Sequence, residues 1–334
     1  QEAKLLAEIK QLYKLNSTYY KLYKRMPDGR MRCSYNPVGS KNGRLSSSRN
    51  IFGEGSNLQN LPPPMKEAML PDEGCFLINI DLSQAENRIV AVIAPEPLLE
   101  DAFIKGKDVH RRTAGLLFDK PEEEISDEPG SSPLGDGTKS ERFWGKQCNH
   151  ALNYGLGYKK FSLRLEIPES QGKMLVERYH EAYPGIRNNF HRWVQESLRA
   201  TRSITDPFGK KRIFLERWGD ELFKSAYSYV PQSTVAYIIN NWGLKKIYYE
   251  NPFRDYQILN QVHDSILMQH KIPKKPWEFQ SLCITLRMIV RSLEQPIPWQ
   301  VRTFVIPAEV KIGLCGNEKK MFTIDTSSED SISR

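Results

Sequence analysis

One stretch of the chain, residues 75–88, constrains its fold more than any other. It reads CFLINIDLSQAENR. The apolar lead before Asp81 predicts a buried β-strand that ends at this residue. Ser83 belongs to a residue type that commonly caps helices, and we expect it to cap a helix that contains the apolar-periodic segment 89–94. A carboxylate at the end of a buried strand is rigidly held and suits a metal ion. From this segment alone, a turn or capping role for Asp81 is equally open.

The composition indicates a globular protein with a preference for anionic partners. Of the 334 residues, 39% are hydrophobic and 26% are charged, which is ordinary for a chain with a sizeable core. The 48 Lys and Arg residues exceed the 40 Asp and Glu residues, and this modest excess favours a polyanion. The five cysteines form no CxxC pair, which favours reduced thiols over a zinc site or a disulfide framework.

Targeting signals are missing from this sequence. No apolar run approaches the roughly 20 residues that a membrane span needs, and no signal peptide opens the chain. We therefore expect a cytoplasmic protein without a membrane partner. The chain starts at Gln1 without Met, and we expect that an upstream portion is missing.

Residues 26–64 are rich in Gly, Ser, Asn and Pro and predict loops rather than core elements. Arg44 and the serines that follow it suit a sugar-phosphate backbone. The amides of Asn57 and Gln59 suit base and sugar edges. Polar loops are common, so this segment alone decides nothing.

A basic stripe is predicted on a helix that opens near residue 141. Thr138 and Glu141 have the spacing of a capping box. The side chains four apart that follow form one slowly drifting stripe: Arg142, Lys146, His150 and Tyr154. Two cations, an imidazole and a phenol in this order suit a triphosphate, a sugar and a base, whereas the ordinary alternative is a solvent-facing basic stripe. The preceding segment 121–139 reads as an acidic, flexible insertion.

A tight hairpin is predicted over residues 256–270, which read YQILNQVHDSILMQH. Two apolar runs flank a turn from which Asp264 projects. An aspartate in a hairpin is usually only a turn former, so this feature gains weight only beside the others.

Together these segments resemble the family A DNA polymerases, the group of bacterial DNA polymerase I and bacteriophage replicative enzymes. DLSQAENR is similar to motif A, RFWGKQCNHALNYG to motif B and QVHDS to motif C, in the order of that family. GRLSSS, NLQN, KDVHRRTAGLLF, FGKKR and PQST match as well. The resemblance covers about residues 27–313, and an ordered set of this size is far more specific than one motif.

The resemblance implies an α+β fold of the right-hand polymerase type, with an antiparallel-sheet palm, helical fingers and a largely absent thumb. We assign residues 1–25 to a residual thumb or connecting helix, 26–100 to the first part of the palm, 101–200 to the fingers, 201–315 to the second part of the palm and 316–334 to a flexible tail.

The resemblance also implies template-directed DNA polymerase activity, in which deoxynucleoside triphosphates are added to a primer 3′-hydroxyl and pyrophosphate is released. Its cofactors would be two magnesium ions, which activate the hydroxyl and neutralise the triphosphate. The implied metal ligands are Asp81, Asp264 and the backbone carbonyl of Leu82.

Further site residues follow from the same resemblance. Lys146 would be catalytic as a proton donor to pyrophosphate, and Glu86 would exclude a ribose 2′-hydroxyl. The implied nucleotide contacts are Gln84, Glu86, His110, Arg142, Lys146, His150 and Tyr154. The implied contacts to primer-template DNA are Arg44, Asn57, Gln59, Lys224, Gln232 and His263.

The chain departs from the family pattern at several points, among them Ser265 and His150, and two alternative functions stay open. Ser265 stands where most relatives have a glutamate, and His150 replaces an aromatic residue. A single-subunit RNA polymerase also has HDS in motif C, but Glu86 argues against it. A catalytically silent, polymerase-derived DNA-binding module is the other alternative, and the acids and cations of the motifs argue against it. We expect the enzyme in a bacterial cytoplasm or a phage-infected host.

Overall fold

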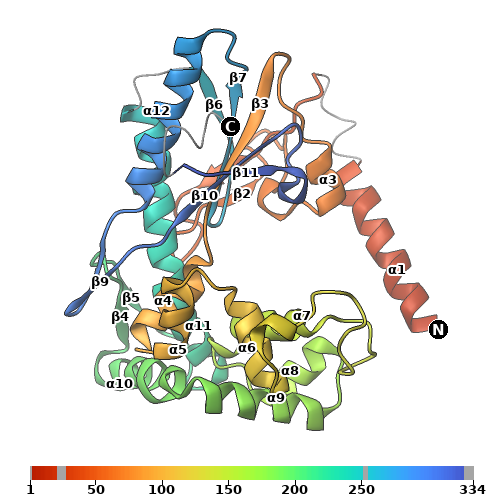
Figure 1. The fold of residues 1–334 in the computed structure, drawn as a ribbon, viewed down its shortest axis with the longest axis vertical. Helices are drawn as coiled ribbons and strands as arrows, with labels where there is room; N and C mark the ends of the chain where they lie inside the picture. The colour runs from red at the N-terminus through yellow and green to blue at the C-terminus, as the bar shows by residue number, and fades with distance from the viewer. Residues whose placement is uncertain (1, 21–27, 251–254, 327–334) are drawn as a thin grey trace. The chain divides into compact units, whose positions relative to one another are not determined.

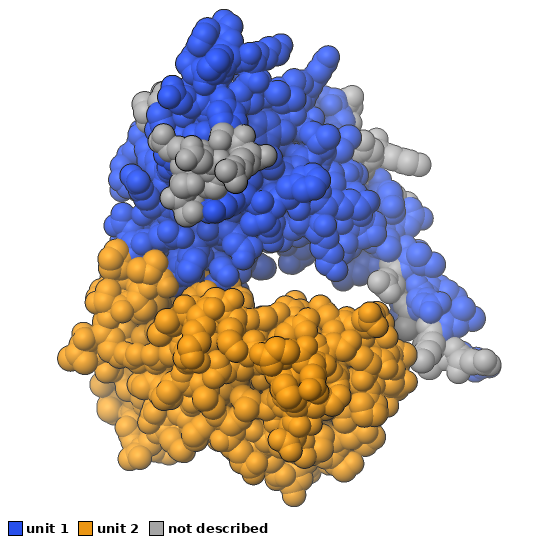
Figure 2. Space-filling model, in the orientation of Figure 1, with its two compact units in different colours: residues 1–83, 235–295, 306–334 blue, residues 84–234, 296–305 orange. Residues whose placement is uncertain are grey.

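The computed structural model describes residues 2–20, 28–250 and 255–326, drawn as a ribbon in Figure 1. The chain forms two compact units, coloured separately in Figure 2. Unit 1 takes residues 1–83, 235–295 and 306–334, and unit 2 takes 84–234 and 296–305. Because the boundary follows Ser83, unit 1 contains Asp81 and unit 2 contains Glu86.

Unit 1 is built on a five-stranded sheet with the order β11-β10-β3-β7-β6, in which every neighbouring pair is antiparallel. Its strands are β3 (Cys75–Leu82), β6 (Tyr256–Val262), β7 (Ser265–Lys271), β10 (Ala308–Gly313) and β11 (Phe322–Ile324). The central strand β3 buries Leu77, Ile78 and Ile80 completely. Burial on both faces explains why this strand reads as a nearly continuous apolar run.

Unit 1 also contains two longer helices, α1 (Glu2–Lys14) and α12 (Pro276–Leu293). Its shorter elements include α3 (Pro63–Glu67), β1 (Ser34–Asn36) and β2 (Ser46–Ser48). Helix α12 opens with a proline in its first turn, and the Glu278 carboxylate accepts the backbone N–H of Lys275 at 3.2 Å. It contacts β10, so it covers part of the sheet (Figure 1). Within the expected tail, Phe322–Ile324 forms β11, and residues 327–334 lie outside the described part.

Unit 2 is mainly helical. Its elements are α4 (Ala85–Ile93), α5 (Pro97–Ile104), α6 (Val109–Phe118), α7 (Glu141–Leu152), α8 (Tyr158–Leu165), α9 (Glu169–Ala182), α10 (Arg192–Thr201), α11 (Asp220–Tyr237, in this unit up to Thr234), β4 (Ser203–Thr205), β5 (Lys211–Ile213), β8 (Ile297–Trp299) and β9 (Arg302–Phe304). Trp144, Phe161 and Tyr179 are fully buried and fill its core.

Helices α6 and α7 lie against each other at Gly145. A Cβ atom at this position would overlap the backbone carbonyl oxygen of His110 and would crowd Ala114. Glycine is therefore required for the observed spacing of the two helices, since any side chain would push them apart.

The expected cap of the helix after β3 is wrong. Gln84, not Ser83, precedes α4, and its φ of 50° lies in the left-handed region without a side-chain capping bond. The backbone N–H of Ser83 donates to the carbonyl of Pro307 at 2.8 Å. Ser83 therefore continues the strand's bonding, and the sharp turn comes one residue later.

The expected capping box of α7 is also wrong. Ser140 is the cap, since its hydroxyl accepts the backbone N–H of Phe143 at 3.1 Å. Glu141 points elsewhere: its buried carboxylate accepts hydrogen bonds from Lys120 and, at 3.0 Å, from the backbone N–H of Ser126. Tertiary hydrogen bonds thus engage the glutamate that the sequence pattern assigned to the cap.

None of the helices within the described residues is long and apolar enough to cross a membrane.

Candidate active site

Two acids that are distant in sequence meet in unit 1. Asp81 lies near the end of β3, paired with Ser265 of β7. Asp264 lies in the two-residue turn that Val262 and Ser265 close between β6 and β7. The backbone N–H of Leu82 donates to the carbonyl of Asp264 at 3.0 Å. The hairpin and the strand therefore bring together acids that are 264 − 81 = 183 residues apart.

The electrostatics of this pair are unfavourable without a cation. Burial and then the charge of Asp264 raise the pKa of Asp81 well above its ordinary value. Glu318 and Glu309 add to the effect, whereas Lys311 opposes it. The fold thus holds negative charge where it repels itself, an arrangement that is common at functional sites.

The donor set fits a hard divalent ion. Within the described ranges, no group of three or more His, Cys, Asp or Glu side chains is placed to hold a metal ion. Two carboxylates remain, with the Leu82 carbonyl as the further oxygen that the resemblance implies. Mg²⁺ is commonly held by one or two carboxylates and completes its shell with waters and substrate phosphates. The residues therefore suit an ion shared with a phosphate substrate.

Ser265 follows Asp264 directly and begins β7. Its side chain is buried, and its hydroxyl donates to the carbonyl of Val262 at 3.1 Å. His263 adopts φ 51°, in the left-handed region that two-residue hairpin turns favour. Ser265 therefore helps to close the turn that presents Asp264.

The predicted stripe of unit 2 is only partly on one helix. Helix α7 carries Arg142, Lys146 and His150, while Tyr154 lies beyond its last residue. Lys146 and His150 are exposed. The hydroxyl of Tyr154 donates to the carboxylate of Glu86 on α4. The structure thus joins the end of the motif B segment to the motif A helix.

His110 is buried, with 6% of its surface exposed. Burial and then the charge of His150 lower the pKa of His110 to about 3, so the ring is neutral at pH 7. The side-chain amide of Asn149 lies 3.1 Å from Nδ1. Since that amide nitrogen can only donate, Nδ1 accepts and Nε2 carries the proton. His110 is therefore prepared as a neutral donor.

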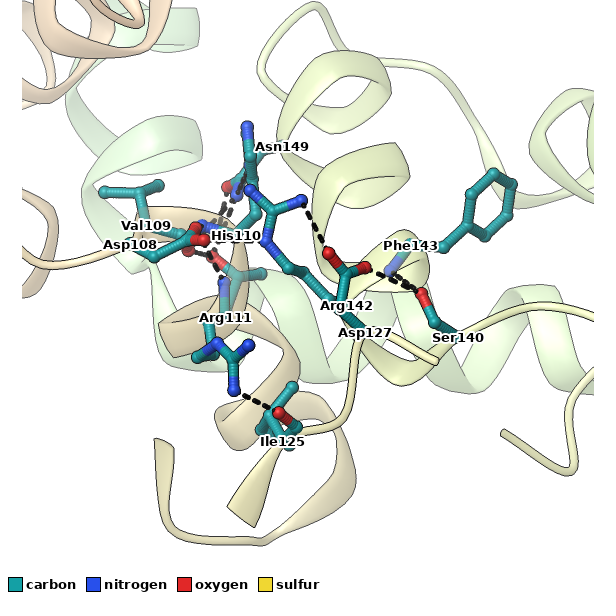
Figure 3. A network of polar contacts seen from close by, with 11 residues as sticks. Asp108, Val109, His110, Arg111, Ile125, Asp127, Ser140, Arg142, Phe143 and Asn149 are labelled. Atoms are coloured by element: carbon teal, nitrogen blue, oxygen red, sulfur yellow. Dashed lines mark hydrogen bonds and ion pairs between the residues drawn. The ribbon is translucent and has the colours of Figure 1, made fainter. Parts of the chain in front are cut away.

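Arg142 sits in a network of carboxylates (Figure 3). Its Nε donates to Asp108 at 2.6 Å, and its guanidinium lies 3.7 Å from Asp127. Asp108 also caps α6 by accepting the backbone N–H groups of His110 and Arg111. Neither acid was predicted from the sequence as part of the site. Asp108 had a signal, because an aspartate before a helical segment is a typical cap, but nothing in the sequence singled out Asp127.

The expected DNA contacts divide between the units. Arg44, Asn57, Gln59 and His263 belong to unit 1, and Lys224 and Gln232 lie on the part of α11 that belongs to unit 2. Gln59 is buried, and its amide bonds to Leu45, Ser47 and Gln261. Asn57 accepts from Ser47 and from the backbone of Gln59. These two amides hold the loop in shape, and contact with DNA stays a prediction for all six.

Gln84 completes the expected nucleotide contacts. It starts unit 2 in a left-handed conformation, and its side-chain oxygen is buried without a hydrogen-bond partner among the residues that the structure describes. A buried acceptor in this condition is unfavourable.

Comparison with known proteins identifies the family to which this chain belongs. Residues 1–313 match the family model described as DNA polymerase family A. The chain belongs to the family A DNA polymerases.

Two relatives within this family illustrate the extent of the similarity. DNA polymerase I of Aquifex aeolicus (strain VF5) is 26% identical over 312 residues, which cover 90% of this chain and 50% of that protein. The thermostable DNA polymerase I of Thermus aquaticus is 26% identical over 330 residues, which cover 92% of this chain and 35% of that protein. The chain thus spans half or less of the length of these relatives.

A solved polymerase structure confirms the fold. The POL domain of Pol1 from M. smegmatis, in complex with DNA primer-template and dNTP, has a TM-score of 0.75 to this chain at 22% identity. The match covers 92% of this chain and 52% of that chain. The α+β fold of the right-hand polymerase type, with its antiparallel sheet, is therefore confirmed.

Proposed function

We propose that this chain adds deoxynucleoside triphosphates to the 3′-hydroxyl of a primer under the direction of a template and releases pyrophosphate. The observation that carries the proposal is the meeting of Asp81 and Asp264 in a chain that matches family A over residues 1–313. The primer oxygen bonds to the α-phosphorus while the bond from that phosphorus to the bridging oxygen breaks. The hydroxyl proton passes to solvent.

Asp81 and Asp264, with the Leu82 carbonyl, would hold two Mg²⁺ ions. When bound, such ions lower the pKa of the primer hydroxyl and neutralise phosphate charge. The raised pKa of Asp81 supports this assignment, since burial and then the repulsion by Asp264 disfavour the charged carboxylate, and a bound cation would favour it.

The cations of α7 would bind the triphosphate. Arg142 offers a planar fork of N–H donors, and Lys146 is an exposed ammonium one turn further along. Lys146 would also protonate the leaving pyrophosphate. His110 would donate from Nε2 to a phosphate oxygen without adding charge, because its Nδ1 is taken by Asn149.

Glu86 and Tyr154 would recognise the sugar and base. The hydrogen bond from the Tyr154 hydroxyl holds the Glu86 carboxylate in place, and a fixed side chain can exclude a ribose 2′-hydroxyl. His150 would lie by the incoming sugar, with Gln84 as a further contact. The primer-template would meet Arg44, Asn57, Gln59, Lys224, Gln232 and His263.

The direct test is extension of a labelled DNA primer on a DNA template with deoxynucleotides, compared with ribonucleotides. We expect extension that requires Mg²⁺, a template and deoxynucleotides. Preferential use of ribonucleotides would instead indicate an RNA polymerase. Binding of DNA without any extension would indicate a silent module and would contradict the proposal.

Replacing Glu86 by alanine should relax sugar selection. We expect the ratio of deoxy- to ribonucleotide kcat/KM to fall roughly 10- to 100-fold, since a steric clash of this kind is worth about 1–3 kcal/mol. Glu86→Gln keeps the size of the side chain and is the matched control, which should discriminate nearly as well as the parent. If Glu86→Ala discriminates as well as the parent, the steric role is wrong.

A further inference from the structure

An acidic side chain lies beside the very arginine that would bind the triphosphate. Asp127 Oδ2 is 3.7 Å from Arg142 Nη1, and Asp127 Oδ1 accepts the hydroxyl of Ser140 at 3.2 Å. Ser140 is the cap of α7. Figure 3 shows Asp127 between these two residues. The start of α7, where a helix favours anions, is therefore already in contact with a carboxylate of the protein.

The segment that carries Asp127 is anchored immediately before it. Ile125 is buried, and its carbonyl accepts a hydrogen bond from Arg111 (Figure 3). Ser126 bonds twice to the start of α7: its N–H donates to the Glu141 carboxylate at 3.0 Å, and its carbonyl accepts the N–H of Arg142 at 3.1 Å. Asp127 is thus placed at Arg142 by the fold.

The two carboxylates at Arg142 are held to different degrees. Asp108 accepts from Nε at 2.6 Å and binds two backbone N–H groups as the cap of α6. Asp127 is further from the guanidinium, and its side chain is 56% exposed against 33% for Asp108. A partly solvated ion pair at this distance is weak. Asp127 is therefore the partner that an incoming anion can replace, while Asp108 orients the guanidinium.

We propose that Asp127 is a resident competitor of the nucleotide: its carboxylate neutralises Arg142 in the free protein, and the triphosphate must displace it to bind. The inference deepens the proposed function and rests on it. Because Asp127 must first be displaced from Arg142, it weakens the binding of every ligand that contacts this arginine. The loss is the same in the ground state and in the transition state. The Asp127 carboxylate should therefore raise the KM for deoxynucleotides and leave kcat unchanged.

The test compares Asp127→Asn with the parent in primer extension and in titration calorimetry with dATP in EDTA. We expect KM for deoxynucleotides and the Kd of dATP to fall about two- to fivefold, because an exposed pair of this kind is worth a few tenths to 1 kcal/mol. Glu128→Gln removes the adjacent exposed charge and should match the parent. Asp127→Glu restores the charge and should bring KM back towards the parent value.

The outcomes separate this inference from the proposed function. A parent that extends primers, with Asp127→Asn unchanged in both KM and Kd, would overturn the competitor role and leave polymerase activity intact. A fall in KM that Glu128→Gln reproduces would also overturn it, since the effect would then be one of net charge. A parent that extends no primer would contradict the proposed function itself, and the calorimetric Kd would still report on Asp127.

Discussion

Asp81→Asn and Asp264→Asn should each lower the rate of primer extension at least roughly a thousandfold. Each variant removes one of the two carboxylates that we propose as ligands of the divalent ions, and charge stabilisation of this kind is worth several kcal/mol, with about 1.4 kcal/mol per tenfold in rate. The measurement is single-turnover extension at saturating deoxynucleotide and Mg²⁺. Extension at the parent's rate by either variant would remove that acid from the reaction.

The loss should not come from unfolding. Asn is nearly the size of Asp, and Asp81→Asn removes the carboxyl group whose pKa is raised by burial and then by the charge of Asp264. In EDTA, this variant should therefore unfold at the same temperature as the parent or a few degrees higher. Asp255→Asn makes the same change at the other end of the β6–β7 hairpin, where Asp255 pairs with Lys271 at 3.5 Å, and should extend primers like the parent.

Lys146→Ala should lower kcat/KM for deoxynucleotides by about 10²- to 10⁴-fold, the range of a positioned proton donor. The same side chain would also supply charge to the phosphates, so KM should rise as kcat falls. The measurement is steady-state extension across a range of deoxynucleotide concentrations. Lys159→Ala, which removes an exposed lysine of α8, is the matched control and should leave both constants near the parent values.

Lys146→Arg separates the two roles of Lys146. The guanidinium keeps the positive charge but does not give up a proton in proteins. We therefore expect KM to stay near the parent value while kcat falls. If Lys146→Arg keeps the full kcat, proton donation by this residue is wrong and only phosphate binding remains.

The sheet around Asp81 could be predicted because its signals are local. The apolar run before Asp81 gave β3, and the two runs around His263 and Asp264 gave the hairpin of β6 and β7. The pairing of β3 with the hairpin could not be derived from either segment. Only the resemblance to a family implied this pairing. Two strands that pair across 183 residues (264 − 81) leave no periodic pattern in the sequence.

The two predictions of helix caps were wrong for a physical reason. Ser83 and the pair Thr138 and Glu141 have the right residue types for caps. In the structure, the Ser83 backbone bonds to Pro307, and Glu141 bonds to Lys120 and Ser126. Those partners are distant in sequence, and their bonds override a local preference of about 1 kcal/mol.

The carboxylates around Arg142 could not be predicted from the sequence for the same reason. Asp127 lies in a segment that reads only as acidic and polar, and its contact with Arg142 depends on how Ile125 and Ser126 anchor that segment. The sequence placed Arg142 on a helical stripe, but it could not show which anions surround this side chain.

The contact of α6 and α7 at Gly145 has a consequence for any motion of α7, the helix that we propose binds the nucleotide. Because the backbones touch where a side chain would collide with the His110 carbonyl, α7 cannot slide or rotate against α6 without losing that fit. The imidazole and the α7 cations should therefore travel together as one rigid body, with their mutual spacing preserved throughout a turnover.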